Sequence, residues 1–170
     1  MRGIFANIYL RNRFFWWMGI LVVAFTAGFW WAPLFFVAQV ALLATMVLLI
    51  VDGLVLFAGN YRFRIRRKLP RVLSLGDATD VKLEVQNRNK LRLRIGLIDE
   101  LPYQLQIRDF YKEFSLAPEE QVELDYEIRP LSRGAYEFGD IILFLSTPLG
   151  LLERRFEKSA ATELPVYPSI

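Results

Sequence analysis

The chain has 170 residues, of which 54% are hydrophobic, 15% are aromatic and none is Cys or His, and its formal net charge is +3. Disulfides and thiolate metal sites are therefore excluded. The commonest general base and transition-metal ligand is also missing, so only carboxylate or Ser/Lys chemistry stays open, and the sequence predicts a non-catalytic protein without a cofactor. The mean hydropathy of +0.28 is too high for an ordinary soluble domain of this size and favours a small domain joined to a membrane anchor.

The first predicted element is an uncharged stretch of 38 residues, from 14 to 51. As one helix it would be about 57 Å long, against a hydrocarbon core of about 30 Å, so two transmembrane helices fit better than one. The break falls at GFWWAP, where Trp30 and Trp31 suit the headgroup level and Pro33 suits the first turn of a helix. The pattern predicts a membrane α-helical hairpin, with helices over residues 14–31 and 33–58.

Basic residues flank both outer ends of this hairpin, whereas its turn carries no charge. Arg2, Arg11 and Arg13 precede it. The six basic residues that follow it within ten positions are Arg62, Arg64, Arg66, Arg67, Lys68 and Arg71. By the positive-inside rule, we expect the chain to cross the membrane twice and to keep both termini in the cytoplasm. A signal peptide is the alternative, but its apolar core would be only about 7–15 residues long.

The basic run RFRIRRKLPR, residues 62–71, could bind nucleic acid, an acidic partner or a membrane surface. Basic residues next to a membrane span attract anionic headgroups by about 1 kcal/mol each. Nucleic-acid binding needs a basic face on a folded module, but residues 72–170 carry twelve basic and seventeen acidic side chains, a net charge of −5. We therefore expect membrane lipids, and no nucleic acid, as partners of this run. The predicted domains are the hairpin over 1–61, a juxtamembrane linker over 62–71 and a β domain over 72–170.

Asp52 is the one acidic residue near the apolar stretch, and it allows two interpretations. If the second helix continues to Ala58, the carboxylate lies below the headgroups, where ionisable groups are costly and usually functional. Alternatively, Asp52 and Gly53 mark the membrane interface. The second interpretation is favoured because about 20 residues are enough to span the membrane.

After Pro70 the hydrophobic period changes to two. Three runs alternate apolar and polar residues: VKLEVQN from Val81, LRLRIGL from Leu91 and VELDYEI from Val122. Such runs are typical of antiparallel sheets with one solvated face. Further strands are predicted over 72–75, 103–107, 135–138, 141–145, 151–156 and 163–167. With turn signals between them, this number of short strands predicts an immunoglobulin-like antiparallel β-sandwich.

Adjacent carboxylates are the remaining candidates for chemistry. Asp99 with Glu100, and Glu119 with Glu120, could form an acid pair of the kind that glycosidases use. Adjacent strand residues point to opposite faces, however, so neither pair converges on one substrate atom by itself. We expect these four residues to be solvated turn residues.

Several segments occur in an order that resembles a known family. They are LPRVLSLGD (69–77), LIDELP (97–102), YEIRPLSRGAYEFGDIILFLSTPLGLLERR (126–155) and VYP (166–168). Together with the hairpin, they resemble the bacterial membrane proteins of the fifty-eighth conserved domain of unknown function, which are typically encoded beside MoxR-type AAA ATPases.

The resemblance implies a membrane-anchored accessory protein with two amino-terminal spans, a cytoplasmic β-sandwich and a MoxR-type ATPase or another membrane-complex protein as partner. In that family a von Willebrand factor A-like part, with its possible metal site, follows the equivalent of VYPSI. The resemblance therefore implies that this chain is an amino-terminal half without residues of that site. Two alternatives stay open: an enzyme acting on the cell envelope, and a module that binds lipid or envelope polymer through residues 62–71.

Overall fold

The computed structural model describes residues 7–58, 61–107 and 110–167. It divides into two compact units. The helical unit comprises Met1–Asn60 and Leu145–Arg155, and the β unit comprises Tyr61–Phe144 and Phe156–Ile170. The division passes through two strands, β9 and β10, so each unit is described by itself. Arg2, part of the predicted amino-terminal charge, lies outside the described residues.

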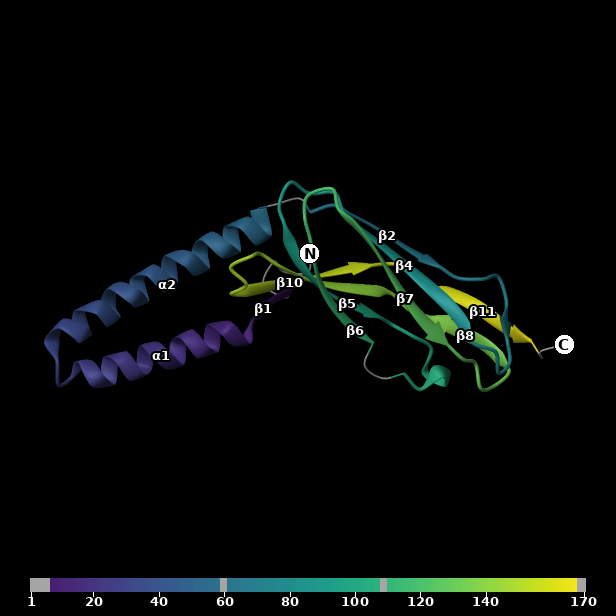
Figure 1. Ribbon diagram of the computed structural model, residues 1–170, viewed down its shortest axis with the longest axis horizontal. Helices are drawn as coiled ribbons and strands as arrows, with labels where there is room; N and C mark the ends of the chain where they lie inside the picture. The colour runs from purple at the N-terminus through teal and green to yellow at the C-terminus, as the bar shows by residue number, and fades with distance from the viewer. Residues whose placement is uncertain (1–6, 59–60, 108–109, 168–170) are drawn as a thin grey trace. The chain divides into compact units, whose positions relative to one another are not determined.

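The helical unit contains two helices joined by a short turn (Figure 1). Helix α1 spans Asn12–Gly28 and α2 spans Ala32–Ala58. The predicted helix pair is thus confirmed, although α1 begins two residues earlier and ends three residues earlier than expected. A short strand, β1 (Ile8–Leu10), pairs antiparallel with the first residues of β10 (Leu152–Lys158). Strand β1 has no counterpart among the predicted elements.

The two helices approach most closely at Gly28. A Cβ atom on this residue would lie 2.8 Å from the Cα atom of Phe35, so only glycine fits here. Leu21 and Ala38 are buried, and the rings of Phe25 and Phe35 meet edge to face with centroids 5.6 Å apart. The close backbone contact explains why position 28 is glycine.

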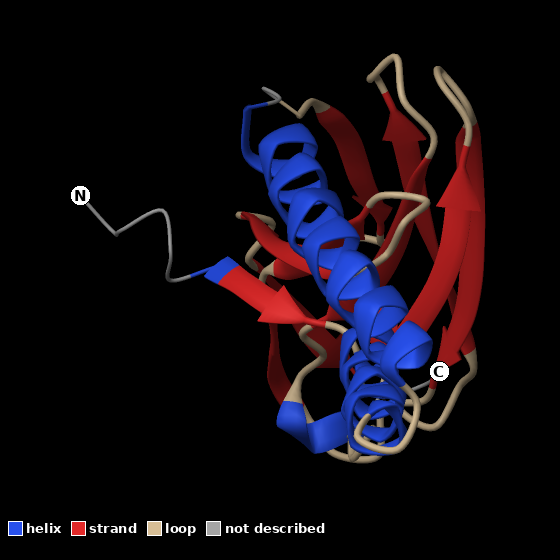
Figure 2. Cartoon of the chain, turned by 90° about the vertical axis from the view of Figure 1, so that its left-hand side faces the viewer, coloured by secondary structure: helices blue, strands red, loops and turns tan. Residues whose placement is uncertain are grey.

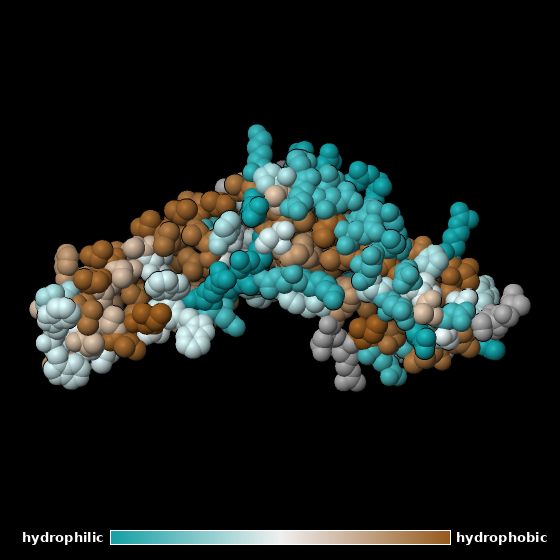
Figure 3. Space-filling model, viewed as in Figure 1, coloured by the Kyte–Doolittle hydropathy of each residue, from teal (hydrophilic) through white to brown (hydrophobic). Residues whose placement is uncertain are grey.

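Most of the helix surface is apolar and exposed. The segment Ala32–Phe57 of α2 is long and apolar enough to cross a membrane. In its most apolar stretch of 18 residues, only 6% of the residues are buried. Among the described helices, α2 is alone in meeting both criteria, since α1 has 17 residues. Figure 3 shows hydrophobic residues along much of the visible surface of both helices. A helix that is apolar all round buries that surface in a membrane or in other protein.

The described residues of the β unit form strands, loops and a short 3-10 helix, η2 (Tyr103–Leu105). Figure 2 shows the strands in red and the helices in blue. The strands of the β unit form three sheets. Their orders are β2-β4-β7, β3-β11-β8 and, within the longer sheet, β9-β5-β6. Strand β4 pairs antiparallel with β2 and β7, β5 with β6, and β11 with β8, whereas β3 runs parallel to β11. The strand bounds are Phe63–Lys68 (β2), Leu73–Ser74 (β3), Thr79–Asn87 (β4), Leu93–Asp99 (β5), Tyr111–Leu116 (β6), Gln121–Ile128 (β7), Gly134–Phe138 (β8), Ile141–Ser146 (β9) and Thr162–Tyr167 (β11).

The period-two runs form the strands that the sequence predicts, and their apolar residues face inward. In β4 and β5 these buried residues are Val81, Leu83, Val85, Leu93, Ile95 and Leu97. Tyr136 of β8 is also buried, and its hydroxyl donates a hydrogen bond to the Ser132 carbonyl at 3.1 Å. Immunoglobulin-like sandwiches contain a comparable bond, the tyrosine corner, in which a tyrosine hydroxyl bonds to backbone just upstream.

Two sequence predictions in this unit are wrong, and one strand has no predicted counterpart. Residues 63–68, expected in a linker, form β2 and pair antiparallel with β4. The strand expected over 103–107 is instead the helix η2, because Pro102 precedes it and Gln106 adopts a left-handed conformation with φ of 56°. Strand β6 was not predicted, because it is largely exposed and lacks a strict apolar alternation.

Candidate functional site

The helical unit contains one buried carboxylate, that of Asp52, six residues before the end of α2. Its Oδ2 atom accepts the backbone N–H groups of Leu151 at 3.1 Å and Leu152 at 2.9 Å, and its Oδ1 atom accepts a bond from the Thr147 hydroxyl. Asp52 therefore fixes the residues between β9 and β10 to the end of α2. Protein donors thus satisfy the carboxylate of Asp52, and its position at the membrane interface stays a prediction.

The start of α1 is fixed to the same segment. Arg11 donates its backbone N–H to the carbonyl of Leu151 at 3.1 Å, and its guanidinium bonds to the Ser146 hydroxyl at 3.0 Å. The guanidinium also forms an ion pair with Glu153 at 3.2 Å. Leu151 thus uses its N–H for Asp52 of α2 and its C=O for Arg11 at the start of α1.

Arg154 makes a third contact at this end of the helices. Its guanidinium donates to the backbone carbonyl of Leu56 at 3.1 Å and lies 5.2 Å from the ring centroid of Phe57. Carbonyls in the last turn of a helix have no partner within the helix, and a basic side chain near that end is favourable. We call Arg11, Asp52, Thr147, Leu151 and Arg154 the basal cluster.

The predicted membrane-surface residues do not act as one group. Arg62, Arg64, Arg66, Lys68 and Arg71 are exposed. Arg67 is not, since only 3% of its side chain is accessible. Strand geometry causes the difference, because side chains alternate across a sheet and Arg67 lies on the inward side with Ile65. Arg67 is therefore withdrawn from the predicted membrane surface.

One exposed member of this run, Lys68, has an acidic partner. On the outer face of β2-β4-β7, Lys68 forms an ion pair with Glu84. Further along the face, Lys82 bonds to Glu123 at 2.8 Å and lies 3.9 Å from Asp125. The hydrogen bond with Glu123 raises the pKa of Lys82, and the same bond lowers the pKa of Glu123. This face is basic along β2 and acidic along β7.

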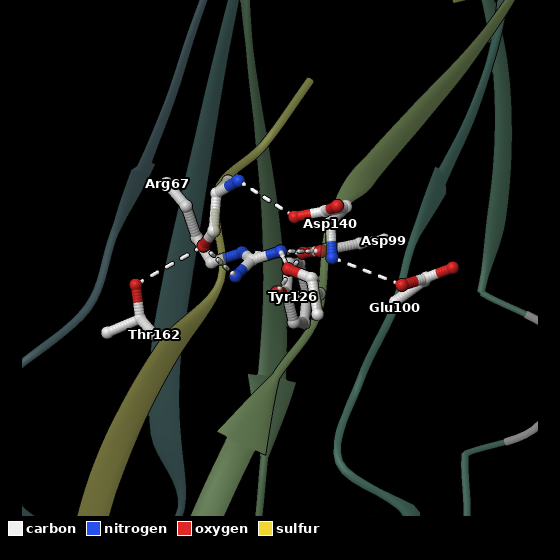
Figure 4. A network of polar contacts seen from close by, with 8 residues as sticks. Arg67, Asp99, Glu100, Tyr126, Asp140 and Thr162 are labelled. Atoms are coloured by element: carbon white, nitrogen blue, oxygen red, sulfur yellow. Dashed lines mark hydrogen bonds and ion pairs between the residues drawn. The ribbon is translucent and has the colours of Figure 1, made fainter. Parts of the chain in front are cut away.

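The buried Arg67 belongs to a network in the β unit that Figure 4 shows. It bonds twice to the carboxylate of Asp99, with a distance of 3.2 Å from Nε to Oδ2. Its other N–H groups donate to the carbonyls of Ala160 at 3.1 Å and Gly139 at 3.0 Å. The guanidinium also lies 5.4 Å from the ring centroid of Phe138. One side chain thereby joins β2 to β5 and to two loops.

The carboxylate of Asp99 also accepts a hydrogen bond from Tyr126, which completes the network. The Tyr126 hydroxyl donates to its Oδ2 atom at 2.6 Å (Figure 4). Burial raises the pKa of Tyr126, and the adjacent Asp99 carboxylate raises it further. A buried ion pair is stable only when further hydrogen bonds satisfy its remaining groups, and this pair meets that condition. The network is therefore best explained as a structural element of the sandwich.

The carboxylate pair proposed for chemistry has structural contacts instead. Asp99 is buried in the ion pair with Arg67, so the expectation of a solvated turn residue is wrong. Glu100 accepts the backbone N–H of Asp140 at 3.1 Å, and its own backbone bonds to Gly139 and Asp140. In the other pair, Glu120 accepts the N–H of Ala117 at 2.6 Å. Among the residues that the structure describes, no three His, Cys, Asp or Glu side chains form a group that could hold a metal ion.

Comparisons with known proteins give a fold but no family. No protein-family model matches the chain. No curated protein matches it either. Solved structures do match. The native alpha-2-macroglobulin of Escherichia coli, from domain MG7 to the C-terminus, matches with a TM-score of 0.51 and 17% identity, over 64% of this chain and 17% of that one.

Two smaller domains match less closely. The CARDB domain of PF1109 from Pyrococcus furiosus, solved with di-metal ions, has a TM-score of 0.44 and 15% identity, over 63% of this chain and 89% of that one. A PapD-like domain of human CEP192 has a TM-score of 0.45 and 13% identity, over 64% of this chain and 87% of that one.

At this identity the likeness to the E. coli protein shows the fold alone, and this chain spans 17% of that protein's length. The predicted antiparallel β-sandwich, with a helix pair before it, is therefore confirmed. Its immunoglobulin-like strand order stays a prediction.

Proposed function

We propose that the chain is a non-catalytic interaction protein anchored in a bacterial inner membrane by α1 and α2. The observation that carries this proposal is the surface of α2, where apolar side chains are exposed along a segment 26 residues long. In water such a surface would be strongly unfavourable, at about 25 cal/mol for each Å² of apolar area. Insertion into lipid removes that cost.

The polar groups along the helices support a specific depth for this anchor. If Asp52 and its partners lie on the cytoplasmic side, residues 33–51 span the apolar layer, a length of about 28 Å against about 30 Å of hydrocarbon. Trp16 and Trp17 near the start of α1, and Trp30 and Trp31 at the turn, are exposed. Such tryptophans suit the two interfaces of a membrane.

Single cysteines test this topology, since the natural chain has none. Ala32→Cys places a thiol at the exposed turn, and Ser159→Cys places one in an exposed loop of the β unit. A membrane-impermeant maleimide should label Ala32→Cys in intact spheroplasts and Ser159→Cys only after lysis. The cysteine-free chain is the background control. Labelling of Ser159→Cys without lysis, or a chain that a carbonate wash releases from the membrane, contradicts the proposal.

The partner that we propose is a MoxR-type AAA ATPase or another protein of the same membrane complex. This part is supported by the sequence resemblance alone. Purification of the chain from its own bacterium in mild detergent should retain the ATPase. A full-length relative, purified in the same way, is the control. If the ATPase co-purifies with that relative but not with this chain, the partner proposal is contradicted and the anchor proposal is unaffected.

A further inference from the structure

Apart from the tryptophan indoles, the uncharged stretch of the chain carries three polar side chains, and two of them are satisfied within their own helix. The Thr26 hydroxyl donates to the carbonyl of Val22, and the Thr45 hydroxyl donates to the carbonyl of Ala41, both at 2.8 Å. The third polar side chain is that of Gln39 in α2. It is exposed, and its amide has no hydrogen-bond partner among the described residues.

The proposed anchor puts Gln39 deep in the apolar layer of the membrane. If residues 33–51 span that layer, Leu42 is the midpoint, and Gln39 lies about 4.5 Å from it along the helix axis. The nearer end of the span is about 9 Å away, which is further than the side chain of glutamine reaches. An amide that faces lipid without a partner is costly, and polar side chains within a membrane span usually bond to another helix.

Gln39 lies in a stripe of large apolar side chains along α2. Consecutive helix residues are 100° apart, so Phe36, Leu43, Met46 and Ile50 lie within about 60° of Gln39 around the helix axis. All four are more than half exposed. We call these five residues the Gln39 stripe. Their spacing alternates between three and four residues, which is the pattern of the seam in a left-handed helix pair.

The helical unit packs against a different side of α2. The buried residues of this helix, Ala38, Asp52 and Leu56, lie about 100–140° from Gln39 by the same rotation. The Gln39 stripe is therefore not the surface that α1 and the basal cluster use. Other exposed positions of α2, such as Val37 and Leu48, carry apolar side chains that lipid can cover. The amide of Gln39 is what lipid cannot satisfy.

We propose that the Gln39 stripe pairs with the same stripe of a second copy of this chain within the membrane. This inference rests on the proposed anchor, because in water an exposed glutamine needs no protein partner. A side-chain amide contains both donors and an acceptor, so each Gln39 can donate to the other across a two-fold axis. One polar residue in an apolar seam also fixes the register of the two helices.

The direction of insertion favours a second copy over a helix of another protein. Two copies that insert in the same direction place their Gln39 amides at the same depth, opposite each other across an axis along the membrane normal. A helix of another protein would need a polar group of its own at that depth. The stripe carries no charge, so two identical stripes do not repel each other.

Disulfide cross-linking in the bacterial membrane tests this contact, since the natural chain has no cysteine. Leu43→Cys places a thiol in the stripe, and Leu48→Cys places one about 180° from Gln39 on an exposed side of the same helix. On mild oxidation, Leu43→Cys should form a dimer and Leu48→Cys should form severalfold less. Adding Gln39→Leu to Leu43→Cys should reduce the dimer severalfold. Gln39→Asn, which retains an amide, should reduce it less.

Sedimentation equilibrium of the purified full chain in detergent micelles measures the same contact without cysteines. The natural chain should have the mass of two copies. Gln39→Leu should raise the dissociation constant about three- to tenfold, because hydrogen bonds between helices in apolar surroundings are of modest strength. Val37→Leu, an apolar change about 160° from Gln39 around the helix, is the matched control and should leave the dissociation constant unchanged.

The outcomes separate this inference from the anchor on which it rests. Gln39→Leu makes the span more apolar, so a loss of dimer in this variant reports the helix contact and not weaker insertion. Release of the chain by a carbonate wash contradicts the anchor and this inference with it. If the chain stays in the membrane, equal cross-linking of Leu43→Cys and Leu48→Cys overturns this inference alone. Cross-linking of Leu43→Cys only to other proteins, or an unchanged dissociation constant in Gln39→Leu, also overturns it.

Discussion

The carboxylate of Asp52 accepts the backbone N–H of Leu151 at 3.1 Å, although 99 positions separate the two residues. The carbonyl of Leu151 accepts the N–H of Arg11, so one peptide segment holds the start of α1 and the end of α2 together. This arrangement makes the basal cluster, rather than the turn at the other end, the polar attachment of the helix pair.

Replacing Asp52 should strongly destabilise the helical unit. Asp52→Ala removes the acceptor of two backbone N–H groups and one hydroxyl, each of which costs about 1–3 kcal/mol when buried without a partner. We expect a loss of at least about 3 kcal/mol. Asp52→Asn retains one acceptor oxygen and should lose less. Denaturant unfolding in detergent micelles measures the loss, and Thr26→Ala, which replaces an exposed polar residue of α1, is the matched control. Equal stability of Asp52→Ala and Thr26→Ala would show that the cluster contributes nothing.

Gly28→Ala should push the helices apart. The added Cβ would lie 2.8 Å from the Phe35 Cα, and neither backbone can yield without a shift of a whole helix. We expect a loss of about 1–3 kcal/mol, the usual cost of overpacking. Gly19→Ala, where no atom lies within 4 Å of the added Cβ, should instead be neutral or gain about 0.5–1 kcal/mol of helix stability. Thermal unfolding followed by circular dichroism measures both variants, and the same sign of change in both would contradict the close contact.

Breaking the Arg67–Asp99 pair should lower the free energy of unfolding more than replacing an exposed basic residue nearby. Arg67→Met leaves a buried carboxylate without its cation, for which about 3–5 kcal/mol is typical. The double variant Arg67→Met with Asp99→Leu should recover part of that loss, since no uncompensated charge remains. Arg66→Met, one residue away on the exposed face, should change the unfolding free energy by less than about 0.5 kcal/mol. A double variant no more stable than Arg67→Met would contradict the ion-pair explanation.

Tyr126 makes the β unit sensitive to alkali. Its folded-state pKa is raised, by burial first and by Asp99 second, so folding favours the protonated phenol. That contribution is complete below the unfolded pKa of about 10 and is lost as the pH rises above it. Ultraviolet titration should find Tyr126 still protonated above the ordinary tyrosine pKa of about 10, and alkaline unfolding should release its proton. In Tyr126→Phe the delayed ionisation should disappear. If the delayed ionisation persisted in Tyr126→Phe, it would belong to another tyrosine.

The sequence predicts those parts of the fold that depend on local pattern. The alternation from Val81 to Val85 indicates both a strand and its buried face, and the uncharged stretch with its Pro33 indicates two helices. Strand β2 is not predicted, because Arg64, Arg66 and Lys68 form a cluster of charge that is typical of a linker beside a membrane. These three basic residues alternate with Phe63, Ile65 and Arg67. That period-two pattern is the sequence signal that indicates a strand here.

The basal cluster and the Arg67 network could not be predicted in the same way. Asp52 finds its donors 95 to 100 positions later, and Arg67 finds Asp99 32 positions later. Contacts at such separations depend on how the strands pair. The spacing of residues along the sequence does not predict that pairing. The conformation of Gln106 was equally hidden, because a left-handed backbone at a residue other than glycine has no clear sequence signal.

The separation between Asp52 and its partners also sets an order of events during synthesis. A ribosome adds about 5–20 residues per second, so Thr147 emerges roughly 5–20 seconds after Asp52. Throughout that interval the nascent helix pair carries a carboxylate whose eventual hydrogen-bond donors do not yet exist. The attachment at Leu151 consequently forms only after the 99 positions that separate Leu151 from Asp52 have been translated.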